Sequence, residues 1–105
     1  MLRGDVYRLK LPKAMGHEQD GPRYGIVVQA DALGQRSTVL LAPTSLSAWP
    51  ASFRPMVEVR GQATRVLTEH IGSYDLRRLG QRVGHLDVEE IWSIDEAIRV
   101  VFGLR

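Results

Sequence analysis

The stretch DVEEIWSIDEAIRVVFG, residues 87–103, is the clearest element of this sequence and the point from which its fold can be worked out. Asp87 is a candidate helix N-cap, and Glu90 stands three residues later, as in a capping box. Gly103 stands where a glycine commonly ends a helix. The apolar residues between these ends are spaced like one face of a helix: Val88, Ile91, Ile94, Ile98, Val101 and Phe102. We therefore predict one amphipathic helix that closes the chain.

The chain before this helix is divided into short apolar segments by glycine and proline, a pattern typical of strands and turns. The predicted strands are residues 5–11, 23–29, 37–42, 56–60, 64–71 and a possible last one at 81–85. The predicted connections are residues 30–36, a loop over 44–55 and one short helical turn within 73–79. About five or six short strands and one helix predict a mainly β fold, a small twisted sheet or partly closed barrel formed by one domain over residues 1–105.

The composition excludes several classes of protein. A hydrophobic fraction of 44% and a charged fraction of 25% are ordinary for a globular chain. There is no cysteine, which excludes disulfides and thiolate metal sites and is compatible with a reducing cytoplasm. We expect neither a signal peptide nor a membrane span, because no apolar run is long enough. Only two of the fourteen basic residues are lysines; arginine suits phosphate binding, although a GC-rich genome also favours it.

The polar segment from Met15 to Arg23 is the most promising place for a chemical site. It brings together the acid or base groups of His17 and Glu18, the amide of Gln19 and the guanidinium of Arg23. The alternative is an ordinary polar loop between two strands, which is the usual meaning of such residues.

Two hydroxyl residues, Thr44 and Ser45, follow Pro43, where the third predicted strand ends. That strand neighbours the one that begins at Arg23, so both hydroxyls could lie beside the Arg23 side chain. No HExxH zinc motif, serine-nucleophile elbow or glycine-rich nucleotide loop is present. Glu69 and His70 are adjacent in a predicted strand and would point to opposite faces. We therefore predict no metal site and no cofactor.

In chain order, several short motifs resemble those of the MazF/PemK family of bacterial toxins. They are Arg3–Tyr7, the loop Gly16–Arg23, Ile26–Asp31, Pro43–Ser45, Thr64–Asp75 with Glu69-His70-Ile71, and Gly84–Leu86 with the closing helix. No single motif is specific for the family, but the ordered set of motifs is, and it covers nearly the whole chain.

This resemblance implies a small SH3-like barrel of the CcdB/PemK type that forms a homodimer. It implies a toxin of a type II toxin–antitoxin system, which cuts single-stranded RNA without a metal and leaves 2′,3′-cyclic phosphate and 5′-hydroxyl ends. It implies a cognate MazE-like antitoxin as partner. The catalytic arginine of the family falls on Arg23 and its catalytic threonine on Thr44.

The sequence departs from the family pattern at four positions. The family's serine is His17 here, its proline after the arginine is Tyr24, and the last two polar residues of its E-Q-I-R motif are His70 and Gly72. Since an imidazole titrates near neutral pH, we hypothesise that His17 transfers protons. Alternatively, His17 only replaces the serine. Glu18 is a second candidate base.

We expect RNA contacts from Gln19, Ser45, Trp49, Glu69 and His70. Exposed aromatic rings stack on unpaired bases, but Trp49 could equally belong to a hydrophobic flap over the core, and His70 could be a packed strand residue. Two other functions stay open: a non-catalytic CcdB-like toxin that binds DNA gyrase, and a catalytically inactive RNA-binding relative.

Overall fold

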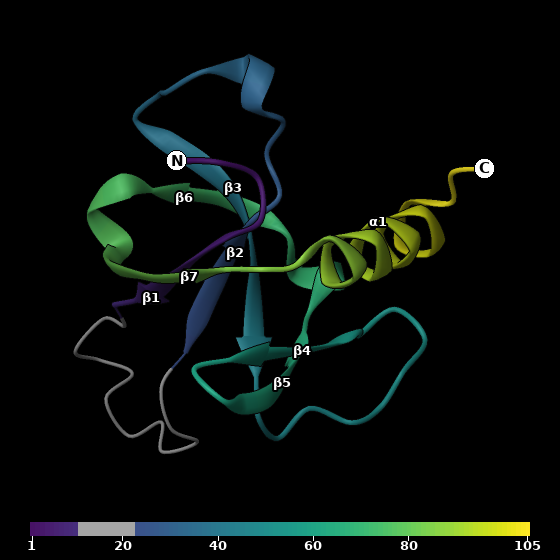
Figure 1. Cartoon of the computed structure of the whole chain (residues 1–105). Helices are drawn as coiled ribbons and strands as arrows, with labels where there is room; N and C mark the ends of the chain where they lie inside the picture. Colours follow the sequence, from purple (N-terminus) through teal and green to yellow (C-terminus); the bar gives the residue numbers. More distant parts are fainter. Residues whose placement is uncertain (11–22) are drawn as a thin grey trace.

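The computed structural model describes residues 1–10 and 23–105, and within them it contains strands and one long helix (Figure 1). The strands are β1 (Asp5–Leu9), β2 (Tyr24–Val27), β3 (Thr38–Ser45), β4 (Met56–Val59), β5 (Gln62–Val66), β6 (Gly72–Asp75) and β7 (Leu79–His85). The helix is α1 (Val88–Phe102), and three short 3-10 turns are η2 (Asp31–Leu33), η3 (Thr68–His70) and η4 (Leu76–Arg78). The prediction of a mainly β fold with a C-terminal helix is confirmed.

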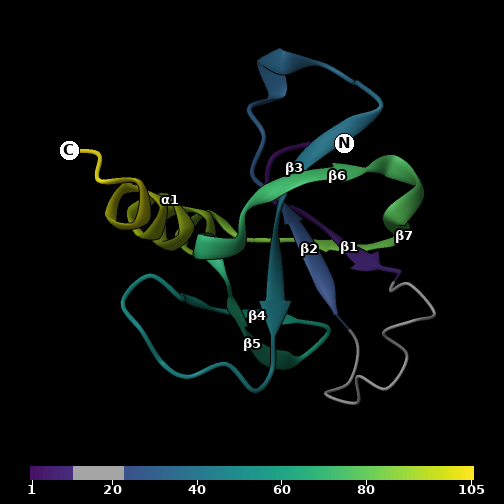
Figure 2. The same cartoon turned by 180° about the vertical axis from the view of Figure 1, so that it is seen from behind.

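The strands form one curled antiparallel sheet in the order β4-β5-β3-β2-β1-β7, and β6 also pairs with β3. β3 is the longest strand and has partners on both edges: β2 along one, and β5 and β6 in succession along the other. Figures 1 and 2 show β6 and β7 curving over one end of the sheet while the β4–β5 hairpin lies at the other. The curl produces a half-barrel.

Two apolar clusters lie on opposite sides of the central strands, because neighbouring strand residues point to opposite faces. Val6 and Ile26 belong to the larger cluster, which also receives Ile94 from α1. Leu9 and Val27 belong to the smaller cluster, which β6, η4 and β7 cover. Burial of both faces explains why β2 reads as a continuous apolar run rather than an alternating one.

The helix has the predicted ends, and the middle of its predicted apolar face, at Ile91, Ile94 and Ile98, packs on the larger cluster. The Asp87 side chain accepts the Glu90 amide, the Glu90 side chain accepts the Asp87 amide, and Gly103 is left-handed with φ 70°. However, only Ile94 and Ala97 are fully buried, while Val88 and Phe102 are 55% and 57% exposed. The far end of α1 projects away from the sheet (Figures 1 and 2), so the apolar stripe is longer than the surface it packs on.

The third strand does not end at Pro43 as predicted but runs on to Ser45. Proline is tolerated here because Pro43 lies between the segment that pairs with β6 and the segment that pairs with β5, where no amide donor is required. The Pro43 carbonyl is still used, and it accepts the Leu67 amide at 2.8 Å.

The prediction of one strand over 64–71 is wrong, since β5 ends at Val66 and η3 follows it. Glu69 and His70 therefore lie on a tight turn, and their side chains do not point to opposite faces: Nε2 of His70 is 3.8 Å from Oε2 of Glu69. The predicted helical turn within 73–79 is η4, but β6 precedes it.

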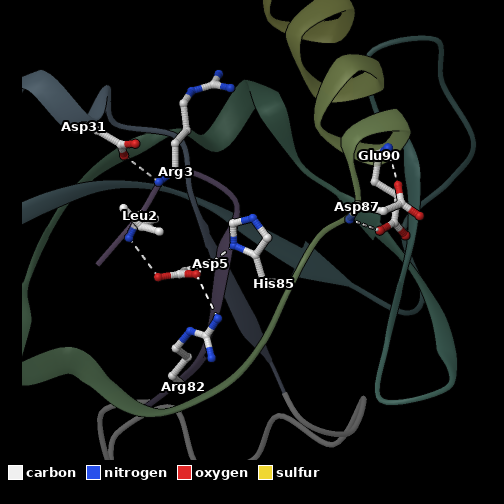
Figure 3. A network of polar contacts seen from close by, with 8 residues as sticks. All are labelled: Leu2, Arg3, Asp5, Asp31, Arg82, His85, Asp87 and Glu90. Atoms are coloured by element: carbon white, nitrogen blue, oxygen red, sulfur yellow. Dashed lines mark hydrogen bonds and ion pairs between the residues drawn. The ribbon is translucent and has the colours of Figure 1, made fainter.

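A buried carboxylate, Asp5, connects the first strand to the last (Figure 3). Its side chain accepts the Leu2 amide at 2.8 Å, Nδ1 of His85 at 2.8 Å and an amino group of Arg82 at 3.2 Å. Burial alone raises the pKa of Asp5, but these hydrogen bonds outweigh burial and hold the pKa below its ordinary value of 3.8. The folded state therefore favours the charged carboxylate.

We predict that Asp5 makes folding stability depend on pH in the acid range. Because its pKa is lower in the folded chain than in the unfolded chain, its stabilising effect is complete above the unfolded value and is lost as the pH falls through the folded value. The excess stability of the wild type over Asp5→Asn should shrink as urea unfolding is measured from about pH 6 down to about pH 2. Glu58→Gln, an exposed carboxylate on β4, is the control, and an excess that does not change with pH would contradict the prediction.

Candidate functional site

The backbone around Arg23 is fixed by both neighbouring strands, and its side chain is left available. The Arg23 carbonyl accepts the Leu9 amide from β1 at 3.0 Å. The next amide, that of Tyr24, donates to Oγ1 of Thr44 on β3 at 3.2 Å. Within residues 1–10 and 23–105, the half-buried Arg23 guanidinium has no hydrogen bond or ion pair. A cation held in this way is suited to bind an anion from outside the chain.

Thr44 and Ser45 lie at the end of β3, next to Arg23 as the sequence predicts. Thr44 is only 1% exposed, and it pairs with Val66 on β5. Its hydroxyl therefore holds the start of β2 in place, and direct contact with a ligand would require the surrounding surface to open. The Ser45 hydroxyl accepts the Ser47 amide at 3.3 Å, which begins the loop that leaves the sheet.

Two exposed basic residues, Arg8 and Lys10, stand on either side of Leu9, whose amide donates to the Arg23 carbonyl. Arg8 lies opposite Tyr24 across the β1–β2 pair, and its guanidinium carbon is 5.7 Å from the centre of the Tyr24 ring. Lys10 follows β1, and its amide donates to the carbonyl of Arg78. The alternation in the first strand did place Arg8 and Lys10 on its polar face, so their common exposure was predictable, whereas the bond between Leu9 and Arg23 depends on the strand pairing.

A second group of predicted residues surrounds Arg54. Its Nε donates to Oε2 of Glu69 at 2.8 Å, and another of its amino groups donates to the Trp49 carbonyl at 3.1 Å. Its guanidinium carbon lies 5.5 Å from the centre of the Phe53 ring. Burial by itself raises the pKa of Glu69, but Arg54 outweighs it and keeps that pKa below the ordinary 4.5. The structure thus joins Trp49 and Glu69, which are far apart in sequence, through Arg54.

The side chains of Trp49 and His70 are exposed at 83% and 62%. The alternatives of a flap over the core for Trp49 and of a packed strand histidine for His70 do not agree with this exposure. The Arg54–Glu69 pair was missed because it connects a loop to a turn that the sequence analysis assigned to a strand.

Three predicted site residues, His17, Glu18 and Gln19, lie outside the described residues. In the described part of the chain, no group of three or more histidine, aspartate and glutamate side chains is placed to hold a metal ion. Nor does the described part contain a helix that is long and apolar enough to cross a membrane.

Comparison with known proteins identifies the family. Residues 2–102 match the PemK-like, MazF-like toxins of type II toxin–antitoxin systems. The chain belongs to this family. A candidate toxin of Mycobacterium tuberculosis is 38% identical over 99% of both chains. Endoribonuclease EndoA of Bacillus subtilis is 32% identical over 97% of this chain and 94% of its own length. The family inferred from the short motifs is confirmed.

Solved structures of MazF-type toxins share the fold. A mycobacterial endoribonuclease in complex with its cognate antitoxin matches with a TM-score of 0.81, at 19% identity, over 100% of this chain and 97% of the other. MazF from Deinococcus radiodurans matches with a TM-score of 0.78, at 21% identity, over 99% and 97% of the two chains. These matches confirm the predicted barrel type.

Proposed function

We propose that this toxin is a metal-independent endoribonuclease that cleaves single-stranded RNA at specific sequences. Its membership of the MazF-like family and its similarity to a relative named endoribonuclease support the class of reaction. The observation that carries the proposal is the position of Arg23, whose backbone is held by β1 and β3 while its guanidinium has no partner among the described residues. Such a cation can donate two parallel hydrogen bonds to a phosphate.

The proposed reaction is attack by the ribose 2′-hydroxyl on the adjacent phosphate. The oxygen–phosphorus bond to the next nucleotide breaks, which leaves a 2′,3′-cyclic phosphate and a 5′-hydroxyl. A base must accept the 2′-hydroxyl proton, an acid must protonate the leaving oxygen, and positive charge must stabilise the crowded phosphate. Arg23 supplies the charge, because guanidinium stays protonated at ordinary pH and is a poor base. Thr44 supports it by holding the adjacent amide.

In this proposal His17 or Glu18 transfers the protons, since both precede Arg23 closely in the sequence. Ser45, Trp49, Glu69 and His70 form the RNA-binding face together with Gln19. The exposure of Trp49 and His70 and the exposed basic side chains of Arg8 and Lys10 support an RNA surface here. We place the activity in the cytoplasm.

We further propose that a MazE-like antitoxin and a second copy of the chain are its protein partners. A solved endoribonuclease of similar fold is bound to its cognate antitoxin, and a MazE–MazF structure from Deinococcus radiodurans also matches this chain.

The proposal of a homodimer is supported by an exposed apolar face of α1. Val88 and Trp92, four residues apart, lie on one face of the helix and are 55% and 61% exposed. Apolar exposure on this scale is typical of a surface that a partner covers.

The cleavage proposal predicts that the purified toxin cuts a long single-stranded RNA in the presence of EDTA. Arg23→Ala should lose at least about a hundredfold in rate, as expected when a donor to the reacting phosphate is removed. A substrate with 2′-deoxyribose at the cleaved position should resist cleavage. Arg36→Ala, an exposed arginine beyond the far end of β2, is the matched control and should cut normally.

Each other outcome of this experiment favours another function. RNA binding without cleavage would indicate the catalytically inactive relative. Neither binding nor cleavage, with binding to DNA gyrase, would indicate a CcdB-like toxin. Cleavage that EDTA abolishes would contradict the metal-independent mechanism.

Proton transfer by His17 predicts a pH-dependent defect. His17→Ala should slow cleavage most near neutral pH, and the rate profile between about pH 5 and pH 8 should lose one titrating group, because histidine titrates in that range. His17→Ser, which restores the family's residue, separates the two interpretations. A rate and profile like those of the wild type in both variants would leave Glu18 as the candidate base.

The homodimer proposal predicts that Trp92→Glu releases monomers, because a charge would be buried in the apolar contact. Sedimentation velocity at micromolar concentration should show the wild type as a dimer and the variant at half that mass. Leu33→Glu, on the exposed η2 turn, is the control and should stay dimeric. A wild type that sediments as a monomer at all concentrations would reject the proposal.

A further inference from the structure

The side chain of Arg54 joins three segments of the molecule. Its Nε and one amino group contact Oε2 of Glu69 on η3, and its other amino group donates to the Trp49 carbonyl. Its own carbonyl accepts from the guanidinium of Arg65 on β5 at 2.9 Å. The guanidinium also lies over the Phe53 ring. Arg54 therefore attaches the loop between β3 and β4 to β5 and to η3. Two bonds nearer β4 join the loop to the same elements, from the Thr68 hydroxyl to the Phe53 carbonyl and from the Val66 amide to the Pro55 carbonyl.

The contact with the Trp49 carbonyl fixes the backbone that carries the indole. Pro50 follows Trp49, and a residue before proline is restricted to extended conformations. Proline has no amide hydrogen, so the Trp49 carbonyl is the only hydrogen-bonding group in the peptide bond that joins these two residues. A bond to this carbonyl therefore sets the orientation of the Trp49 backbone, while the residue as a whole stays 83% exposed.

The charge of Arg54 is already used inside the protein. Its guanidinium donates to Glu69 and to Trp49, and its ion pair with Glu69 leaves both side chains only about a quarter exposed, at 24% and 23%. The second carboxylate oxygen of Glu69, Oε1, is buried and has no hydrogen-bond partner among residues 1–10 and 23–105. The Arg54 guanidinium is thus not free to bind a phosphate, in contrast to Arg23, which has no partner among the described residues.

We propose that Arg54 is a positioning residue that presents the Trp49 indole as a stacking surface for one unpaired RNA base. Glu69, although it belongs to the proposed RNA-binding face, then acts through Arg54 and not by touching the RNA itself. It holds the guanidinium in the plane that reaches the Trp49 carbonyl. This inference rests on the proposed function and adds how one base is held. An exposed indole on a fixed backbone loses little freedom when a base stacks on it, which favours binding.

The geometry requires arginine in particular. Lysine carries the same charge, but its ammonium group is a point donor on a flexible stem and cannot hold a carboxylate and a carbonyl in one plane. Arg54→Lys should therefore remove the hydrogen bond to the Trp49 carbonyl with no change in net charge. Glu69→Gln should weaken the contact that holds the Arg54 guanidinium on η3, with little change in the shape of the side chain at position 69.

The test measures binding of a fluorescein-labelled 2′-O-methyl RNA of mixed sequence, which cannot be cleaved by 2′-hydroxyl attack. Trp49→Ala should weaken binding about tenfold, the effect of losing one stacked base. Arg54→Lys and Glu69→Gln should weaken it in the same direction by a smaller or equal factor. The decisive variant is Trp49→Ala with Arg54→Lys, which should bind no more weakly than Trp49→Ala alone, because Arg54 acts only through the indole.

Cleavage of a long RNA gives a second readout. Arg54→Lys should raise KM and leave kcat close to that of the wild type, since stacking is made equally in the bound and the reacting complex. Arg36→Lys is the matched control and should change neither value. Urea unfolding of each variant shows whether it is folded, and if Arg54→Lys is not, Glu69→Gln replaces it in the combined variant.

The outcomes separate this inference from the proposed function. If the wild type binds and cuts RNA but Arg54→Lys behaves like it, or if the effects of Arg54→Lys and Trp49→Ala multiply, the positioning role is wrong and the proposed function stands. If the wild type neither binds nor cuts RNA, both are wrong.

Discussion

The buried carboxylate of Asp5 is the contact on which the arrangement of the chain depends. It joins β1 to β7 over a sequence separation of 80 residues and also holds the Leu2 amide (Figure 3). A buried carboxylate is costly unless its oxygens are all satisfied, and here a backbone amide, an imidazole and a guanidinium share that task. The register of the first strand against the last is therefore strongly specified, and a slip by one residue would leave the charge unpaired.

The turn before Asp5 contacts the start of α1 and so fixes where the helix lies on the sheet. Gly4 has φ +96°, and a Cβ atom there would lie 2.7 Å from Cδ1 of Ile91. Its amide donates to the Val27 carbonyl, and its carbonyl accepts the Leu86 amide just before α1 begins. Only glycine combines that dihedral angle with so close an approach. The N-terminal turn thus seats the first turns of α1 on the sheet, and the later turns extend beyond it.

Much of the fold followed from local patterns, because the interactions that decide it are local. The capping box of α1 lies within four residues, and the continuous apolar run of β2 reflects burial on both faces. The two wrong strand ends, at Pro43 and after Val66, have a common cause: both depend on contacts between segments that are distant in sequence. Pro43 ends a strand in most local contexts, and only the succession of β6 and β5 along one edge of β3 removes the need for its amide. Likewise, η3 forms where the chain passes from β5 to β6, a feature of the tertiary arrangement.

One part of the candidate site was predictable from the sequence and another was not, again because only short local patterns can be recognised in a sequence. Arg23 and Thr44 could be paired because the motifs that carry them occur in the expected order, and the structure connects them through the Tyr24 amide. The pair formed by Arg54 and Glu69 could not be predicted, because it requires a loop and a turn whose positions no short pattern fixes. The residue types predicted which side chains belong to the candidate site, whereas the hydrogen bonds that join them are seen only in the three-dimensional fold.

The charges of the described residues fall into two classes, and this division agrees with the two tasks that RNA recognition requires. Arg54 is ion-paired with Glu69 and Arg82 with Asp5, so these cations belong to the internal structure. Arg23 has no ion pair within residues 1–10 and 23–105. Contacts to phosphate position a nucleic acid, and contacts to bases read its sequence. Under the proposed function, Arg23 holds the backbone of the RNA, and the Trp49 indole that Arg54 positions stacks on one base.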